Sequence, residues 1–292
     1  MNFGLMLNED EFRGSTMKAR TKPTPKCLTI AGSDSGGGAG IQADLKTFAA
    51  NGVYGTSAVT AITAQNTTGV QDILELPVTL IENQIDSVLT DIGTDAVKTG
   101  MLFSSEIIRA VVRKLSQYQI ENIVVDPVMV AKGGDKLLHD EAIEALKTEL
   151  IPIASVVTPN GPEATAITGI NVVDVNSAKA AAVRLVEMGC KSAVVKGGHI
   201  DEGPATDIFY DGTSFYLFTT KRVNTLNTHG TGCTFASAIA AGVAKGMSTR
   251  NSVSQAKAFV TGSIRHDLKI GTGHGPLNHF HEYWKSDELE ID

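Results

Sequence analysis

The feature that most constrains the fold is an alternation of short apolar runs with helical patterns, which begins at Cys27. Several runs are almost wholly apolar, as strands covered on both faces are. Between them, the apolar residues of 79–92 recur at the spacing of one helix face. Because parallel neighbours need long crossovers, this order predicts an α/β fold: a doubly wound, mostly parallel sheet with helices on both faces. The predicted strands are Cys27–Ala31, Ser57–Thr63, Ala96–Thr99, Ile123–Asp126, Val156–Thr158 and Ser192–Lys196.

The second half of the chain adds a hairpin and further helices. Asp211-Gly212 separates two strand-like runs, 206–210 and 214–218, which is typical of a hairpin. Asn176 is the predicted N-cap of a helix over 177–188, and two more helices are predicted at 232–245 and 251–268. Since no linker, composition shift or repeat interrupts the pattern, residues 27–292 are predicted to form a single domain. Residues 1–26 are predicted to be a disordered leader or tag, with Met17 as an alternative start.

Charge and cysteine content narrow the class of protein. The chain has 25 Lys and Arg against 32 Asp and Glu, a net charge of −7, which argues against a nucleic-acid binder. It contains no run of about 18 apolar residues, so no membrane span is predicted. The three cysteines (Cys27, Cys190 and Cys233) are far apart, which predicts no disulfide framework and favours the cytoplasm. His279 and His281 are interpreted as a polar tail rather than as zinc ligands.

Glycine is the residue type in excess, and fourteen of the 29 glycines fall after predicted strands or near the C-terminus, Gly133 and Gly134 among them. Ligands of open α/β sheets bind beyond the carboxyl ends of the strands. The cluster Gly32–Gly40 follows the first strand, and we interpret it as a ligand loop rather than a tight turn. A dinucleotide fingerprint would need a small residue where Ile41 stands, and a Walker A sequence is absent. Asp44 either faces the same pocket or is a solvated acid of the first helical turn.

A second cluster, Asn227–Thr234, enters an alanine-rich helix. Backbone N–H groups at such a helix start can hold an anion, including charge that develops on a transferred phosphoryl group. Cys233 lies in that first turn, where a lowered pKa and a thiolate are expected. A small buried cysteine under a helix cap is an equally good interpretation.

Three further polar groups follow predicted strands. Asn160 and Glu163 could share a network of magnesium, water and phosphate, although a capping box explains the same spacing and is favoured by the sequence alone. Asp126 ends an apolar strand and is therefore expected to face the pocket. Lys196 ends another strand and offers a cation for phosphate, or it is a lysine whose stem lies along the strand edge.

Taken together, these motifs resemble the hydroxymethylpyrimidine/phosphomethylpyrimidine kinases of thiamine biosynthesis, members of the ribokinase-like superfamily. The resemblance runs from about Cys27 to the segment 271–281. As a set, the motifs are highly specific. They are Thr29–Asp34, Gly37–Thr47, Ala64–Thr67, Lys98–Leu102, Asp126–Met129, Thr158–Glu163, Lys196–His199 and His229–Thr234.

The resemblance implies an α/β kinase that uses ATP and Mg²⁺. It implies two successive phosphorylations of one aminopyrimidine, first on its hydroxymethyl group and then on the resulting monophosphate. It also leads us to expect a cytoplasmic homodimer with small-molecule substrates and neither nucleic acid nor membrane as a partner. The implied substrate-binding residues are Gln65, Gly32, Asp44, Met101 and Val128. The implied ATP and phosphate ligands are Lys196, Asn160 and Asp126, with Glu163 at the metal and Gly230, Thr231, Gly232 and Cys233 as the catalytic anion hole.

One departure and three rival interpretations remain. Most sugar kinases of the superfamily carry an Asp base where this chain has Cys233. A pyridoxal or pyridoxine kinase of the same fold is the nearest rival, but the amide of Gln65 suits an amino group beside a ring nitrogen. A nicotinamide-dependent oxidoreductase would need an acidic residue near 58–62, and none is present there. A ligand-binding module without catalytic activity is the third.

Overall fold

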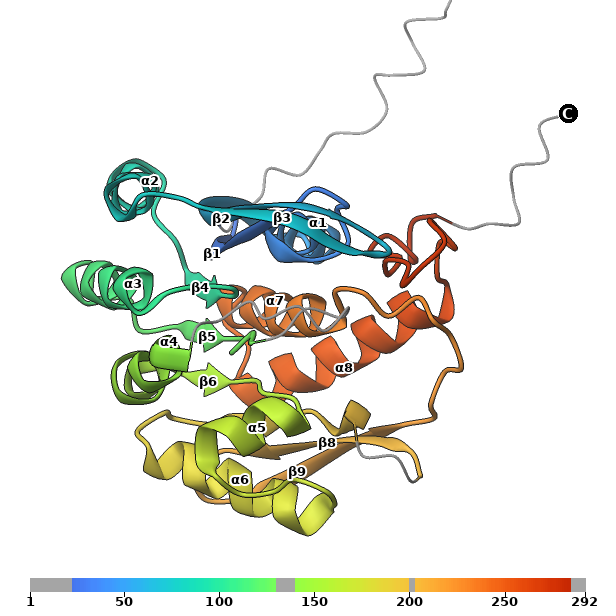
Figure 1. Ribbon diagram of the computed structural model, residues 1–292. Helices are drawn as coiled ribbons and strands as arrows, with labels where there is room; N and C mark the ends of the chain where they lie inside the picture. The colour runs from blue at the N-terminus through green and yellow to red at the C-terminus, as the bar shows by residue number, and fades with distance from the viewer. Residues whose placement is uncertain (1–22, 130–139, 200–202, 285–292) are drawn as a thin grey trace, which may run out of the picture.

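The computed structural model describes residues 23–129, 140–199 and 203–284. Their strands form one sheet in the order β3-β2-β1-β4-β5-β6-β7-β8-β9 (Figure 1). The neighbours from β2 to β7 are parallel, whereas β3, β8 and β9 pair antiparallel at the two edges. The strands are β1 (Lys26–Asp34), β2 (Tyr54–Asn66), β3 (Gly69–Glu75), β4 (Ala96–Thr99), β5 (Ile123–Val125), β6 (Val156–Val157), β7 (Ala193–Val195), β8 (Ala205–Tyr210) and β9 (Phe215–Thr220).

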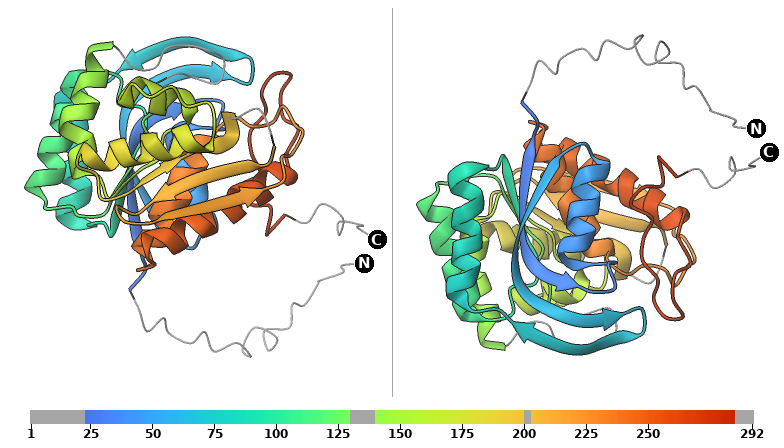
Figure 2. Two further views of the ribbon diagram at one scale, coloured as in Figure 1. Left: turned by 90° about the horizontal axis from the view of Figure 1, so that it is seen from below. Right: turned by 90° about the horizontal axis from the view of Figure 1, so that it is seen from above.

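Helices cover both faces of this sheet, as Figure 2 shows. One layer contains α2 (Val78–Asp91), α3 (Ser105–Gln117), α4 (Asp140–Ala145) with the short turns η2 (Leu146–Leu150) and η3 (Ile151–Ile153), α5 (Gly161–Thr168) and α6 (Val175–Glu187). The other contains α1 (Gly40–Ala50), α7 (Thr231–Ala244) and α8 (Thr249–Arg265). A short turn, η4 (Gly197–His199), follows β7.

Successive strand residues supply the two cores in turn. In β5, Ile123 and Val125 belong to the core beneath α2–α6, and Val124 belongs to the core beneath α1, α7 and α8. This alternation follows from the two-residue period of a strand, and it explains why the central strands are apolar throughout. The predicted doubly wound sheet is confirmed.

Individual boundaries differ from the predictions in a few places. Strand β3 was not predicted, and β1 and β2 are longer than expected. The predicted N-cap Asn176 is wrong. The cap is Asp174, whose carboxylate accepts a 2.7 Å hydrogen bond from the Ser177 backbone N–H while the Ser177 side chain bonds back to the Asp174 backbone. Gly133 and Gly134 lie outside the described residues, as do residues 1–22 of the predicted leader.

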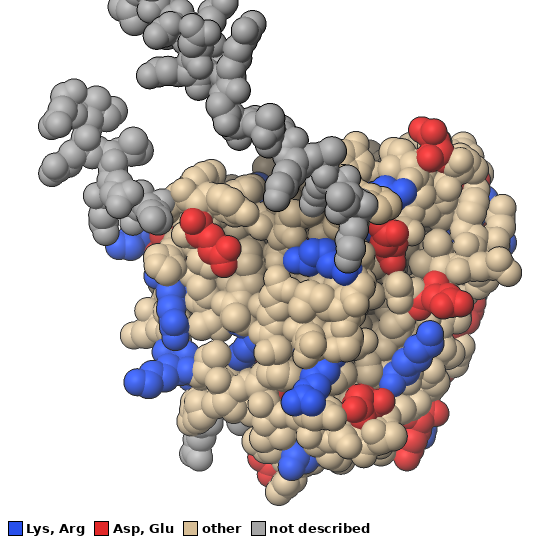
Figure 3. Space-filling model, turned by 180° about the vertical axis from the view of Figure 1, so that it is seen from behind, with Lys and Arg blue, Asp and Glu red and all other residues tan. Residues whose placement is uncertain are grey.

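The surface of the described residues carries charges of both signs. On the face drawn in Figure 3, Lys and Arg side chains are interspersed with Asp and Glu side chains and form no continuous basic surface. No helix within the described ranges is both long and apolar enough to cross a membrane.

Candidate active site

The carboxyl ends of β5, β6 and β7 bring three polar groups together. The Lys196 Nζ lies 2.9 Å from Asp126 Oδ1, and Thr158 Oγ1 donates to the same oxygen at 3.3 Å. Asp126 is only 2% exposed. Burial acts to lower the pKa of Lys196, but the attraction of Asp126 and Glu163 outweighs it and holds the pKa above its ordinary value. The pair therefore places a fixed ammonium at the edge where the strands end.

Asn160 and Glu163 form the capping box of α5. The Asn160 Oδ1 accepts from the Glu163 N–H at 2.9 Å, and the Glu163 Oε2 accepts from the Asn160 N–H at 2.7 Å. The capping interpretation is confirmed. The Asn160 backbone pairs with that of Lys196, and the Glu163 carboxylate acts electrostatically on the Lys196 ammonium. Burial raises the pKa of Glu163 to about 7, with nearby Asp126 adding to the rise and Lys196 opposing it.

The start of α7 packs directly against these groups. A methyl group on Gly232 would lie 3.2 Å from Lys196 Nζ and 3.5 Å from Asp126 Oδ2. Gly230 has a positive φ of +82°, and a methyl group there would lie 1.8 Å from the Gly38 carbonyl oxygen. The two glycine clusters of the sequence are thus in contact with each other. The first turn of α7 thus lies beside the Lys196 ammonium, an arrangement suited to an anion, and within it the Thr231 N–H donates to the Thr228 carbonyl at 3.3 Å.

Cys233 corrects one prediction about its chemistry. The side chain is half-buried, and burial raises its pKa to about 11, although the neighbouring Lys98 acts in the opposite direction. Asp44 and Asp126 add to the rise. The lowered pKa expected from the helix start is therefore wrong, and Cys233 is a neutral thiol at neutral pH.

Asp44 lies in a fully buried network rather than at the surface. Lys98 Nζ donates to both of its oxygens, at 3.0 and 2.9 Å, and both residues are 0% exposed. The hydroxyls of Thr29 and Ser237 each donate to it at 2.6 Å. These four hydrogen bonds tie α1, β1, β4 and α7 together, and the solvated alternative for Asp44 is wrong.

The remaining expected substrate residues gather where β1, β2, β4 and β5 end. A methyl group on Gly32 would lie 2.3 Å from Met101 Cε, so these two residues are in contact. Met101 and Ala61 form a small apolar cluster against which Val128 packs. Gln65, at the end of β2, is partly buried.

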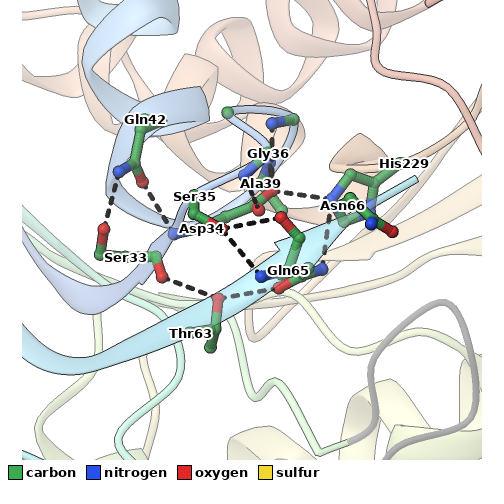
Figure 4. Close-up of polar contacts among 12 residues, drawn as sticks. Ser33, Asp34, Ser35, Gly36, Ala39, Gln42, Thr63, Gln65, Asn66 and His229 are labelled. Carbon is green, nitrogen blue, oxygen red and sulfur yellow. Dashed lines mark hydrogen bonds and ion pairs between the residues drawn. The ribbon is translucent and has the colours of Figure 1, made fainter. Parts of the chain in front are cut away.

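Two residues that received no role in the sequence analysis stand beside Gln65. Its Nε2 lies 3.4 Å from the Nε2 of His229, and that ring nitrogen lies 2.8 Å from an Asp34 carboxylate oxygen (Figure 4). Their positions in the sequence could have indicated a functional role, because Asp34 stands inside the first glycine cluster and His229 directly precedes Gly230. The buried Lys98 likewise received no role of its own from the sequence, although it lies in one of the family motifs.

The chain is similar to known proteins over most of its length. A family model described as phosphomethylpyrimidine kinase matches residues 34–278. The chain belongs to the phosphomethylpyrimidine kinase family. The hydroxymethylpyrimidine/phosphomethylpyrimidine kinase of Bacillus subtilis is 50% identical over 256 residues, which are 87% of this chain and 94% of that protein. The thiamine biosynthesis bifunctional protein ThiED of Geobacter sulfurreducens is 51% identical over 262 residues, but this chain spans only 54% of its length.

Solved structures agree with this family and its fold. A phosphomethylpyrimidine kinase from Clostridium difficile matches with a TM-score of 0.74 and 45% identity, over 82% of this chain and 99% of that one. An ADP complex of Bacillus subtilis pyridoxal kinase matches with a TM-score of 0.84 and 37% identity, over 90% of this chain and all of that one. The family resemblance expected from the motifs is confirmed, and so is the ribokinase-like fold.

Proposed function

We propose that this protein is an ATP-dependent kinase that phosphorylates 4-amino-5-hydroxymethyl-2-methylpyrimidine and then its monophosphate, in thiamine biosynthesis. The observation that carries the proposal is the contact of the α7 start, Gly230–Cys233, with the Asp126–Lys196 pair. Gln65 lies near the same helix start, because its side chain is 3.4 Å from His229, the residue before Gly230. The names of the relatives support the same activity.

The proposed division of roles follows from charge and donor type. The N–H groups of Gly232 and Cys233 hold charge that develops on the transferred phosphoryl group, and the Thr231 N–H, now bonded to the Thr228 carbonyl, would have to turn from that acceptor to join them. Lys196 neutralises phosphate oxygens of ATP, with Asp126 holding its ammonium in place. Asn160 and Glu163 present oxygen atoms, the donor type that Mg²⁺ prefers, and Glu163 is the proposed metal-side ligand. Mg²⁺, when bound with ATP, would offset negative charge on the phosphates.

The thiolate form of Cys233, a small fraction at neutral pH because of the raised pKa, is the proposed acceptor of the hydroxymethyl proton in the first phosphorylation. The second acceptor is an ionised phosphate, which needs little help from a base. Cys233→Ala is therefore expected to slow the first step more than the second. Equal loss in both steps would remove this role from Cys233.

The test is a product analysis by mass. Incubation with magnesium-ATP and the hydroxymethylpyrimidine should give first a monophosphate and then a diphosphate. Lys196→Met should abolish both products, whereas Lys179→Met, a change on α6 outside the site, should leave both unchanged. A single addition would contradict the two-step activity, and no addition would contradict the kinase assignment for this substrate.

A pyridoxal kinase is the second candidate, because structures named pyridoxal kinase match this chain with TM-scores of 0.84. The Gln65 amide favours the pyrimidine, since it can pair with an amino group and a ring nitrogen together. The two alcohols should be compared by kcat/KM with the same ATP concentration. A tenfold preference for pyridoxal would overturn our choice.

We further propose that the protein is a homodimer in the cytoplasm. Ile62 and Leu74 are register partners on β2 and β3 and remain 47% and 65% exposed. Apolar side chains that stand together at a sheet edge suit an interface between copies. Light scattering of the purified protein should give twice the monomer mass, and Leu74→Asp should reduce it; a monomer mass before substitution would contradict the dimer.

A further inference from the structure

The Asp34 carboxylate joins the two glycine loops. Its oxygens accept from the backbone N–H groups of Gly36, Gly38 and Ala39 at 2.8, 3.0 and 2.8 Å, and Asp34 is 3% exposed. The same carboxylate meets the ring of His229 at 2.8 Å, across 195 positions of sequence. In Figure 4, Asp34 and His229 lie on one side of the Gln65 amide and Thr63 lies on the other.

The hydrogen in the Asp34–His229 bond belongs to the histidine. Burial alone would raise the pKa of Asp34, but the hydrogen bonds from His229 and the backbone hold it below the ordinary value, so the group is a carboxylate. A carboxylate only accepts hydrogen bonds. The Nε2 of His229 must therefore carry the hydrogen and has no lone pair left to offer.

This protonation decides which end of the Gln65 amide can face His229. An amide nitrogen is a donor, so it cannot bond a ring N–H across the 3.4 Å that separates the two nitrogen atoms. The hydroxyl of Thr63 donates to the Ser33 carbonyl at 2.9 Å, and its oxygen can then only accept from the amide 3.1 Å away. Both contacts are satisfied when the amide oxygen faces His229 and the amide nitrogen faces Thr63, which is a half-turn of the carboxamide.

We infer that the Asp34–His229 pair fixes the orientation of the Gln65 carboxamide and thereby makes the site select a 4-aminopyrimidine over its 4-oxo analogue. With Thr63 and His229 each using one amide site, one acceptor and one donor remain for the substrate. In this orientation they match an amino group beside a ring nitrogen. A 4-oxo ring presents the reverse order, a carbonyl beside a ring N–H.

Binding of the 4-oxo ring would create mismatched hydrogen-bonding groups at both neighbours of the Gln65 amide, His229 and Thr63. The amide would have to turn back, which sets two donors against each other at His229 and two acceptors against each other at Thr63. Buried polar groups without partners are costly, and a site built to hydrogen-bond one pattern rejects another strongly. Asp34 and His229 are thus positioning residues for substrate choice. This inference rests on the proposed function in one respect, that Gln65 meets the substrate ring.

The test compares kcat/KM for the 4-amino substrate and the 4-oxo analogue. The unmodified protein should prefer the amino ring by at least about 100-fold. In His229→Phe, where the amide is free to turn, the preference should fall below about 10-fold, and His229→Gln, which retains an N–H donor, should restore much of it. His266→Phe, at an exposed histidine that follows α8, is the matched control and should leave the ratio unchanged. If His229→Phe slows both substrates by the same factor, the inference is overturned.

A second measurement does not depend on turnover. Nitrogen-15 NMR of the histidine side chains should show the His229 hydrogen on Nε2 at neutral pH, and Asp34→Asn should change that signal. An Nε2 of His229 without a hydrogen, as in the tautomer protonated on Nδ1 alone, would overturn the inference, whatever the activity of the protein. If neither pyrimidine reacts but the hydrogen is on Nε2, the proposed function fails while the arrangement of Asp34 and His229 is upheld.

Discussion

The chemistry of Cys233 offers the sharpest quantitative prediction. Its pKa is raised to about 11 from an ordinary 9.0, because burial disfavours the thiolate more than Lys98 favours it. Since these pKa values differ by about two, the thiolate fraction near pH 8 should be about 100-fold smaller than that of a free cysteine. The thiolate is the form that alkylating reagents attack, so labelling should slow by about the same factor.

The assay is alkylation by iodoacetamide from pH 7 to 11, followed by peptide mass spectrometry. Cys27 and Cys190 are 0% and 2% exposed and should remain unlabelled, which makes them internal controls for folding. A short peptide with the sequence around Cys233 supplies the rate of an unperturbed thiol. A midpoint at or below pH 9 in the folded protein would refute the reasoning from burial and restore the thiolate expected at a helix start.

Lys98→Met extends the same prediction. It removes the charge that favours the Cys233 thiolate, so labelling should slow further. It also leaves the buried carboxylate of Asp44 without its ion-pair partner, which should lower the free energy of unfolding by about 3–5 kcal/mol. If Cys233 is labelled faster in Lys98→Met than in the parent protein, in a sample shown by circular dichroism to be folded, the stabilising effect of Lys98 on the thiolate is contradicted.

Three further predictions concern other residues of the two helix layers and the site. Burial lowers the pKa of His279 to about 4 from 6.5, so the unfolded chain takes up the proton first as the pH falls. Above pH 6.5 this histidine is mainly neutral in both the folded and the unfolded state, so its effect on stability is fully favourable there. About 2 kcal/mol of unfolding free energy should be lost by pH 5. Urea titrations should show a weaker pH dependence in His279→Gln, and an equal one would contradict this. Gly230→Ala should lower kcat/KM by at least about 100-fold, because its methyl group would overlap the Gly38 carbonyl. Gly169→Ala, also at positive φ but with open space, should not. Thr99→Val should raise the unfolding free energy by about 1 kcal/mol in the same titrations, because the Thr99 hydroxyl has no partner among the described residues; a decrease would count against it.

The fold was largely predictable because the central strands are buried on both faces. Strand β4 matches its predicted bounds, since no polar residue except Lys98 and the threonine at its end interrupts it. Strand β3 has four of its seven residues exposed and lacks the alternation that signals a half-buried strand, so it was missed. The cap of α6 shows the ordinary limit of local rules: Asp174 and Asn176 are both good caps, and only the Ser177 contact distinguishes them.

The site was predictable in place but not in detail. Loops after parallel strands must meet at one edge, and this placed Asp126, Asn160 and Lys196 correctly together. What the sequence could not show are contacts between residues far apart in the chain. His279 lies in a polar segment, yet it is 3% exposed and within 2.9 Å of Thr234 on α7, so the expected polar tail is wrong. The Cys233 pKa and the Asp34–His229 bond depend on equally distant neighbours.

The contact between Gly38 and Gly230 has a consequence for the order in which the protein is made. The first loop leaves the ribosome soon after β1, whereas the second follows β9 and waits for most of the chain. A shortened chain that stops before α7 lacks the carbonyl-to-glycine contact, the start of α7 and the Ser237 hydroxyl that bonds Asp44. During synthesis, therefore, α1 and β4 emerge with the Asp44 carboxylate and the Lys98 ammonium long before α7 can seal them from water. Nucleotide binding by the nascent chain should begin only once α7 has docked, so ligand protection would report completion of the final folding step.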